Sequence, residues 1–158
     1  MSIQKTNVMR ILDSANINYN TYTYESKEGA IDGVSVANKI GQPVEKVYKT
    51  LVTRGASKNF FIFVIPVSKE LNLKAAAKSV GEKSVEMIRM DEINKVTGYI
   101  RGGCSPIGMK KDYRTVVDSS CESIDSIIFS AGKIGFQVEV NPAELIEFVK
   151  AVVAPVAD

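Results

Sequence analysis

Two neighbouring runs of β-branched and aromatic residues constrain most strongly what this chain can fold into. Residues 47–54 (VYKTLVTR) and 60–66 (FFIFVIP) have the composition of strands, and residues 55–59 (GASKN) between them are typical of a turn. Strand, turn and strand in this order predict a β-hairpin. Period-2 alternation along the first run makes both faces of that strand substantially apolar.

Similar patterns predict further elements on both sides of this hairpin. Strands are predicted at residues 19–24, 85–88, 115–118, 126–130 and 135–140, with a short turn between the last two. Helical spacing of apolar residues predicts helices at residues 8–15, 36–40, 73–80, 91–96 and 142–149. Residues favoured at helix ends flank them: Thr6, Asp91 and Asn141 as N-caps, and Gly41 and Gly81 as stops.

The balance of these elements indicates the fold class. The 158 residues are 45% hydrophobic and 24% charged, which is typical of one globular domain, so we assign residues 1–158 to a single domain. Strands outnumber helices, and several successive strands lie close enough in the sequence for hairpins. We therefore predict an α+β fold with a mixed, mostly antiparallel sheet and helices packed on it.

The absence of histidine from the chain excludes many catalytic designs. Ser-His-Asp triads, Cys-His pairs, HExxH zinc sites and imidazole bases all require that side chain. Cys104 and Cys121 do not form a closely spaced pair, so a zinc site is not expected either. We predict a protein that needs no metal and no cofactor.

Charge and hydropathy limit the compartment and the partners. Residues 1–5 lack the apolar run of a signal peptide, and no stretch approaches the roughly 18 apolar residues of a membrane span, which favours a cytoplasmic protein. A net charge of +2 and a pI of about 8.5 fall short of the basic balance of a dedicated nucleic-acid-binding domain. We expect no DNA partner, and contacts with RNA should be local.

Lys49 is the first candidate functional residue, because it interrupts an otherwise apolar strand face. It shares that face with Val47 and Leu51, while Thr50 points to the other face. Such a lysine either extends to solvent at the sheet edge or points into a cleft where its ammonium meets an anion or a carbonyl group. The strand pattern leaves both possibilities open.

Residues 98–108 (GYIRGGCSPIG) form the second candidate, a glycine-rich loop. Glycine permits close approach of a ligand to the backbone and can leave amides free for an oxyanion, although glycine pairs also occur in ordinary turns. Cys104 in this loop has no histidine to activate it, so a buried structural role is the favoured interpretation. Four nearby cations either form a phosphate-binding patch or a solvated face: Arg101, Lys110, Lys111 and Arg114.

Taken together, the motifs VYKTL (47–51), LNLKAAAK (71–78), GYIRGGCSPIG (98–108) and SAGK (130–133) resemble, in order and spacing, those of the YbaK family of Cys-tRNA(Pro) deacylases. The resemblance covers nearly the whole chain. It implies a curved, mixed, mostly antiparallel sheet related to the editing domain of bacterial prolyl-tRNA synthetases. Cys104 stands where valine or isoleucine is expected, and Ala131 where glycine is common.

The resemblance also implies roles for six residues. Lys49 and Gly102 would be catalytic, and four residues would bind the substrate: Tyr24, Thr50, Gly103 and Ser130. The implied substrate is the 3′ end of a mischarged aminoacyl-tRNA, most directly Cys-tRNA(Pro). The family is thought to let the thiol of the misattached cysteine attack its own ester, which suits a chain without histidine.

Three hypotheses about the function stay open from the sequence. The first is thiol-assisted removal of cysteine from tRNA(Pro), and the second is removal of alanine from tRNA(Pro), which must use water because alanine has no thiol. The third is a non-catalytic module that binds tRNA ends or a synthetase. Because the net charge is modest, we also expect that a partner such as prolyl-tRNA synthetase helps to select the tRNA.

Overall fold

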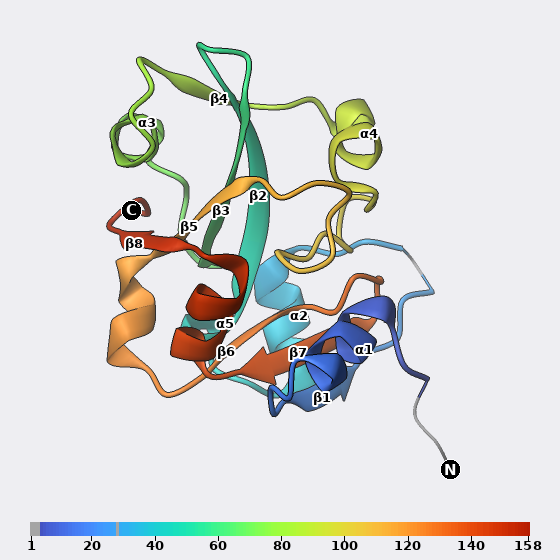
Figure 1. Cartoon of the computed structure of the whole chain (residues 1–158). Helices are drawn as coiled ribbons and strands as arrows, with labels where there is room; N and C mark the ends of the chain where they lie inside the picture. The colour runs from blue at the N-terminus through green and yellow to red at the C-terminus, as the bar shows by residue number, and fades with distance from the viewer. Residues whose placement is uncertain (1–3, 28) are drawn as a thin grey trace.

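The computed structural model describes residues 4–27 and 29–158, which form α-helices, short 3-10 helices and strands (Figure 1). The α-helices are α1 (Asn7–Ser14), α2 (Gly33–Ile40), α3 (Leu73–Ser79), α4 (Ile93–Thr97) and α5 (Pro142–Val149), and the 3-10 helices are η1 (Val44–Lys46), η2 (Met90–Glu92) and η3 (Ser119–Ser123). The strands are β1 (Asn20–Thr23), β2 (Tyr48–Gly55), β3 (Phe60–Pro66), β4 (Val85–Met87), β5 (Arg114–Asp118), β6 (Ile127–Ser130), β7 (Phe136–Val140) and β8 (Val152–Ala154).

The helix boundaries follow the local capping residues. The Thr6 hydroxyl accepts a hydrogen bond from the Met9 N–H at 3.3 Å, and Gly41 ends α2 in the left-handed conformation, as predicted. The predicted cap at Asp91 is wrong, because Asp91 lies inside η2. Arg89 precedes η2 instead, and its N–H donates to the Glu92 carboxylate at 3.1 Å.

Two sheets organise the chain, where the sequence predicted one. β1, β7 and β6 form an antiparallel three-stranded sheet, and the second sheet has the order β4-β2-β3-β5-β8. In the second sheet the β2–β3 hairpin is antiparallel, whereas β5 pairs in parallel with both β3 and β8. The predicted α+β class with mixed, mostly antiparallel pairing is confirmed, and the split into two sheets is a correction to it.

The two sheets meet where β2 begins. Val47, just before β2, forms a parallel bridge with Ile128 of β6, and the Val67 N–H donates to the Val47 carbonyl at 2.9 Å. Ala37 of α2 packs with these three residues in one buried cluster. This junction determines which residues of the two sheets lie side by side.

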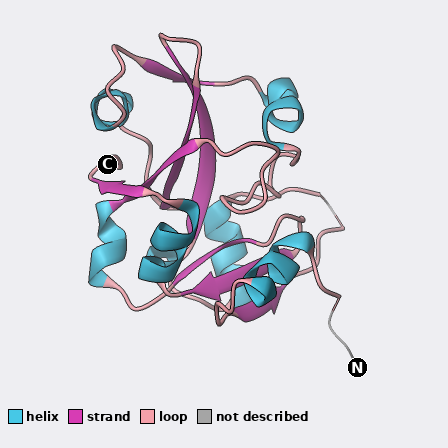
Figure 2. Cartoon of the chain, in the orientation of Figure 1, coloured by secondary structure: helices cyan, strands magenta, loops and turns pink. Residues whose placement is uncertain are grey.

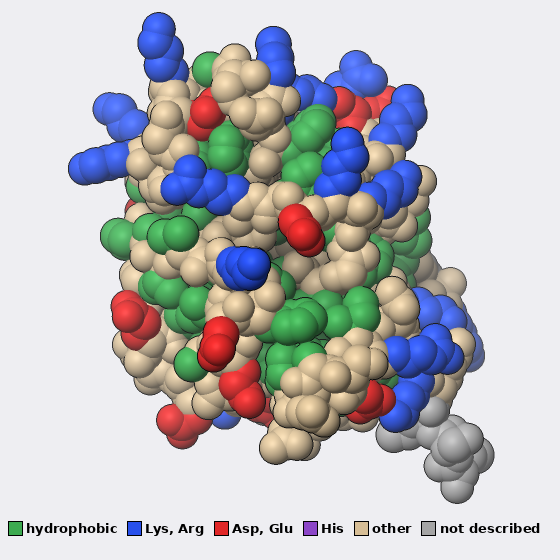
Figure 3. Space-filling model, viewed as in Figure 1, with side chains coloured by type: hydrophobic (Ala, Val, Ile, Leu, Met, Phe, Trp, Pro, Cys, Tyr) green, Lys and Arg blue, Asp and Glu red, His purple; other side chains and the backbone are tan. Residues whose placement is uncertain are grey.

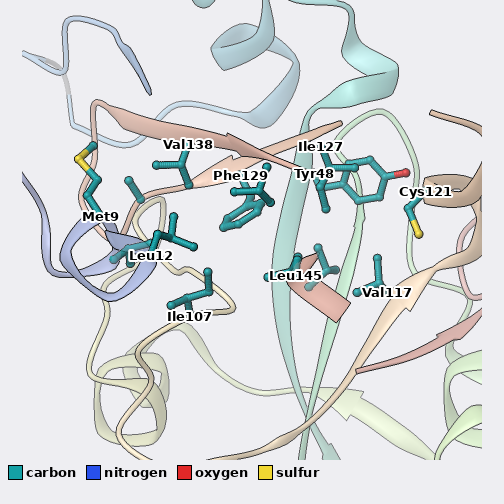
Figure 4. Packing of buried hydrophobic residues seen from close by; sticks show 14 residues of the cluster. Met9, Leu12, Tyr48, Ile107, Val117, Cys121, Ile127, Phe129, Val138 and Leu145 are labelled. Atoms are coloured by element: carbon teal, nitrogen blue, oxygen red, sulfur yellow. The ribbon is translucent and has the colours of Figure 1, made fainter. Parts of the chain in front are cut away.

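The largest hydrophobic cluster joins the two sheets on their inner side. Phe129, Leu12 and Leu145 are almost completely buried there, and Tyr48 and Val117 extend the cluster toward the second sheet (Figure 4). Burying a leucine or phenylalanine side chain contributes about 1.5–3 kcal/mol to the free energy of folding. This cluster therefore fixes the relative placement of β6 and β2.

A long irregular segment, residues 98–113, joins α4 to β5 (Figure 2). Its Ile107 side chain is 1% exposed and belongs to the cluster shown in Figure 4, which anchors the glycine-rich loop to the core. Ile100, near the start of this segment, is exposed and lies outside the helices and strands. Within residues 4–27 and 29–158, no helix combines the length and apolarity needed to cross a bilayer.

Candidate functional site

Lys49 and Ser130 become neighbours because β2 and β6 run side by side in the same direction. Val47 bridges Ile128 in parallel, and β2 and β6 stay in contact beyond that point. Extending this register by two residues, we infer that Lys49 lies near Ser130. The turn that follows β6 then begins close to the Lys49 end of β2.

The Lys49 side chain is half-buried, and its ammonium forms no ion pair with the described residues. Among residues 4–27 and 29–158, no carboxylate lies within ion-pair distance of its ammonium, and no side chain or carbonyl accepts a hydrogen bond from it. Lysine ammonium groups interact with phosphate and with polarised carbonyl oxygens as compact point charges. The ammonium is thus free to meet a ligand of either kind.

Ser130 ends β6 and shapes the turn that leads to β7. Its hydroxyl is buried and accepts a hydrogen bond from the Gly132 N–H at 3.1 Å, while the Ala131 N–H donates to the Phe136 carbonyl at 3.0 Å. Gly132 and Gly135 both have positive φ, at 91° and 95°, as this tight path requires. The Ser130 hydroxyl keeps its own proton to donate.

Gly102 and Gly103 pack directly against this turn. A Cβ added at Gly103 would lie 3.3 Å from the Ile134 nitrogen, and one added at Gly102 would lie 2.6 Å from the Ala30 Cβ. Gly102 also has φ +86°, a conformation that other residues rarely adopt. Three segments far apart in the sequence, near residues 30, 102 and 134, therefore meet at one place.

The two glycines do not offer equivalent backbone donors. The Gly103 N–H donates to the Ile100 carbonyl at 3.0 Å and closes a turn, and Gly103 itself is buried. The Gly103 amide is therefore already used in a hydrogen bond within the protein. The Gly102 N–H has no acceptor in the part of the chain that the structure describes, and Gly102 is exposed.

Tyr24 reaches the same turn from β1. Its N–H donates to the Gly135 carbonyl at 3.0 Å, which extends the β1–β7 ladder by one step beyond the Thr23 and Phe136 pair. The residue is half-buried. The turn after β6 thus has Tyr24 along one flank and Gly102 and Gly103 along another.

Thr50 is not part of this group on the same face. It lies on the opposite side of β2 from Lys49, between Tyr48 and Val52, and both of these neighbours are buried. Its hydroxyl oxygen is buried and has no hydrogen-bond partner among the described residues. Gly102, Gly103 and Tyr24 thus contact the turn that follows Ser130. The register of β2 against β6 places Lys49 near Ser130, whereas Thr50 points to the opposite face of β2.

The two thiols have environments that suppress the thiolate form. Burial raises the pKa of Cys104 to about 12, although a hydrogen bond with Thr97 lowers it. Burial also raises the pKa of Cys121 to about 11, and the charges of nearby carboxylates add to the shift. A thiol in this range is a poor nucleophile near neutral pH, which agrees with the structural role predicted for Cys104.

Neither a surface hollow nor a metal-binding cluster coincides with the predicted site residues in the described part of the chain. Two surface hollows of about 420 and 310 Å³ lie beside α5 and β7, and none of the six predicted site residues lines either. Residues 4–27 and 29–158 contain no cluster of three or more histidine, cysteine or carboxylate side chains that could hold a metal ion. The chemistry of the group therefore depends on the Lys49 ammonium, the hydroxyls of Ser130 and Tyr24, and the exposed Gly102 amide.

The sequence pattern did not single out Ala30, which the structure places against Gly102. An exposed alanine in a polar loop carries no local signal of function. Only a contact between distant segments reveals that it limits the space beside the glycine.

Comparison with known proteins identifies the family of this chain. The family model described as an aminoacyl-tRNA editing domain matches residues 28–148. The chain is 41% identical over 143 residues to EbsC of Enterococcus faecalis, for which a Cys-tRNA(Pro)/Cys-tRNA(Cys) deacylase function is proposed, and the match covers 90% of this chain and 87% of that protein. A proline–tRNA ligase of Fervidobacterium nodosum is 32% identical over 75 residues, which are 48% of this chain but only 13% of the ligase.

A solved structure has the same fold as this chain. The crystal structure of a hypothetical protein superposes with a TM-score of 0.86 at 25% sequence identity, covering 97% of this chain and all of that one. The family match spans well over half of the sequence, and it includes every residue of the Lys49 and Ser130 group except Tyr24. The chain therefore belongs to the aminoacyl-tRNA editing domain family, with the YbaK and EbsC proteins.

Proposed function

We propose that this protein is a trans-editing deacylase that releases cysteine from Cys-tRNA(Pro). Two findings support the proposal. The Val47–Ile128 bridge indicates that Lys49 lies near Ser130, and the turn after Ser130 packs against the exposed Gly102. The chain is also similar to EbsC over most of its length. An unpaired cation, a hydroxyl and a backbone donor are suited to an ester next to a phosphate. The proline-specific part of the proposal draws support from the similarity to a segment of proline–tRNA ligases.

The chemical step would use the thiol of the substrate. The cysteine sulfur attacks its own ester carbonyl carbon, a C–S bond forms, and the C–O bond to the ribose breaks. The thiol proton ends on the departing ribose oxygen, so the products are a cyclic thiolactone and tRNA with a free 3′ terminus. This route needs no protein nucleophile, which agrees with the absence of histidine and with the raised pKa values of both cysteines.

The protein would contribute geometry and electrostatics. Holding the thiol and the carbonyl in a reactive arrangement lowers the barrier by several kcal/mol. The Gly102 N–H would donate to the developing oxyanion, and the Lys49 ammonium would bind the terminal phosphate or polarise the ester. Ser130 would donate its hydroxyl proton to the substrate, since its oxygen already accepts from Gly132.

The decisive experiment compares release of cysteine and of alanine from charged tRNA(Pro) by the wild type and by Lys49→Ala. We expect cysteine release to be preferred, and to fall about 100-fold in the variant, as is usual when one electrostatic contact to the transition state is removed. Lys83→Ala is the matched control, because Lys83 is exposed beyond the opposite end of β2 and should leave the rate unchanged.

The outcomes separate the competing functions. A thiolactone among the products supports attack by the substrate thiol, whereas free cysteine would indicate attack by water. Preferential loss of alanine would point to the water-using activity on Ala-tRNA(Pro). If wild-type protein released neither amino acid, the deacylase proposal would fail and a binding module would replace it.

Selection of the tRNA by prolyl-tRNA synthetase also stays a prediction. A complex of the three components in gel filtration at micromolar concentrations is the expected result. Separate elution of the synthetase, the tRNA and this protein would count against it.

A further inference from the structure

Positive and negative side chains are unevenly distributed in this protein despite its small net charge. Residues 54–114 contain twelve lysines and arginines but six carboxylates, whereas the rest of the chain contains eight and twelve. Lys and Arg side chains accordingly gather over the upper part of the molecule, around α3, β4 and α4, while the acidic side chains on the lower left lie over η3 and α5 (Figure 3). The overall net charge of +2 is therefore the sum of a strongly basic segment, residues 54–114, and an acidic remainder of the chain.

Four cations of this basic segment surround the glycine-rich loop. Lys95, Arg101, Lys110 and Lys111 are all exposed, and we call them the 95–111 basic surface. The Lys110 stem passes beside Gly98, where an added Cβ would lie 3.2 Å from its Cγ, and its ammonium donates to the Lys95 carbonyl at 3.4 Å. Lys95 and Lys110 are thus held next to each other, and Arg101 directly precedes Gly102.

The charges of this surface are not neutralised within the described residues. None of the four cations lies within ion-pair distance of a carboxylate there. The acidic residues of the adjoining η2 are already paired, Asp91 with Arg89 at 3.1 Å and Glu92 with Arg54. Only Asp112 brings an unpaired carboxylate into this stretch of the described chain, so a clear positive excess faces solvent beside the site.

Two exposed apolar side chains lie next to Arg101, one in space and one in the sequence. Met90 is 60% exposed and Ile100 is 57% exposed, and the Arg101 guanidinium lies 3.5 Å from the Met90 sulfur. Cations next to exposed apolar groups suit a nucleotide chain, whose phosphates need positive charge and whose bases need apolar surface.

We infer that the 95–111 basic surface binds the RNA strand that leads into the Lys49 site, through the phosphates next to the 3′ end of the tRNA. This inference rests on the proposed function, because it places the aminoacylated terminus beside Gly102. The surface would supply affinity for the tRNA backbone without reading its sequence, since phosphate contacts carry no base information. A protein with a weakly basic pI can therefore still bind RNA at one defined surface, the 95–111 basic surface.

The test measures binding of uncharged tRNA as a function of salt concentration, so that it does not depend on turnover. Removing one lysine that neutralises a phosphate reduces the slope of log K against log salt by about 0.7–0.9. For the triple variant Lys95→Gln, Lys110→Gln and Lys111→Gln we expect the slope to fall by about 2.1–2.7 and the affinity at low salt to fall at least about tenfold. The control with the same net charge is Lys58→Gln, Lys69→Gln and Lys83→Gln, which lie outside this surface and should bind like the wild type.

Several outcomes would overturn the inference. Unchanged tRNA binding by the triple variant would do so, and so would an equal loss in the control, because net charge alone would then explain the effect. Loss of binding to a synthetase with tRNA binding intact would assign the surface to a protein partner instead. If urea denaturation shows that the triple variant is unfolded, the three single substitutions are measured separately, and each should reduce the slope by about 0.7–0.9.

A small substrate separates this inference from the proposed function. A cysteinyl ester of adenosine lacks the phosphates that the surface would bind, so the triple variant should process it at the wild-type rate while losing activity on full-length tRNA. A variant that lost activity on both substrates would place these lysines in the chemistry and overturn the inference. If the wild type processed neither substrate, the deacylase proposal would fail, and the binding data would still decide the role of the surface.

Discussion

Replacing Gly102 with alanine should both lower the stability of the fold and displace the backbone of the candidate site. Gly102 has φ +86°, and an added Cβ would lie 2.6 Å from the Ala30 Cβ, well inside the ordinary contact distance. Two costs therefore combine in Gly102→Ala. One comes from the backbone conformation, and the other comes from the overlap with Ala30.

The structure allows each cost to be estimated. An L-residue in the left-handed region costs roughly 1–2 kcal/mol, and overpacking costs about 1–3 kcal/mol, so the free energy of unfolding should fall by about 2–5 kcal/mol. Ala30→Gly removes the overlapping methyl group, and the next neighbour, the Ala30 Cα, is 3.4 Å from the added Cβ. The double variant should therefore keep only the backbone cost, apart from the small effect of Ala30→Gly by itself.

Urea denaturation of the wild type, both single variants and the double variant measures the coupling between the two positions. We expect the double variant to regain about 1–3 kcal/mol relative to the two single effects added together. Gly81→Ala is the matched control, because Gly81 has φ +72° but no atom within 4 Å of an added Cβ. It should show the backbone cost alone.

Deacylation assays on the same variants connect this packing to function. If displacement of the Gly102 amide matters, Gly102→Ala should lose about 100-fold in rate, the double variant should recover part of that loss, and Gly81→Ala should match the wild type. A double variant that is as unstable as Gly102→Ala, within about 0.5 kcal/mol, would refute the argument from the Ala30 contact.

Three further predictions concern buried groups. Burial raises the pKa of Asp118, but hydrogen bonds from Ser120 and from two C-terminal backbone amides outweigh it and hold the pKa below its ordinary value. The stabilisation by this carboxylate is present above the ordinary pKa of aspartate and should be lost as the pH falls through the lowered pKa. Asp118→Asn should lower the free energy of unfolding by about 1–3 kcal/mol at pH 7. Urea denaturation at several pH values should also show that the variant loses less stability than the wild type as the pH falls. Cys104→Ala should keep deacylation within about twofold, because a thiol with a pKa of about 12 supplies no nucleophile near pH 7. Thr50→Val should leave the free energy of unfolding unchanged or raise it by about 1 kcal/mol, since the Thr50 hydroxyl is buried without a partner among the described residues; a large loss of stability would contradict this.

Local chemistry was enough to predict most of the helices and strands. The hairpin of β2 and β3, the turn between β6 and β7, and the Asn141 cap of α5 each depend on residues close together in the sequence. Strand β8 was missed, because three residues after a helix carry too little pattern. It forms since β5 offers it a parallel neighbour and Asp118 accepts hydrogen bonds from the amides that follow it.

The candidate residues themselves could also be named from the sequence. Lys49 stands out as a charge on an apolar strand face, and the paired glycines at 102 and 103 stand out in their loop. The resemblance to a known family supplied Tyr24 and Ser130. The proximity of these residues in space depends on contacts between distant segments, which the sequence does not show.

Tertiary structure alone decided how these residues meet. The sequence already predicts that Lys49 and Thr50 point to opposite faces of β2, because successive side chains alternate between the two faces of any strand. The parallel bridge between Val47 and Ile128 brings Ser130 to Lys49, and it exists only because the two sheets share a core. The turn that uses the Gly103 amide leaves the Gly102 amide as the exposed donor, a distinction that the pair of identical residues in the sequence does not contain.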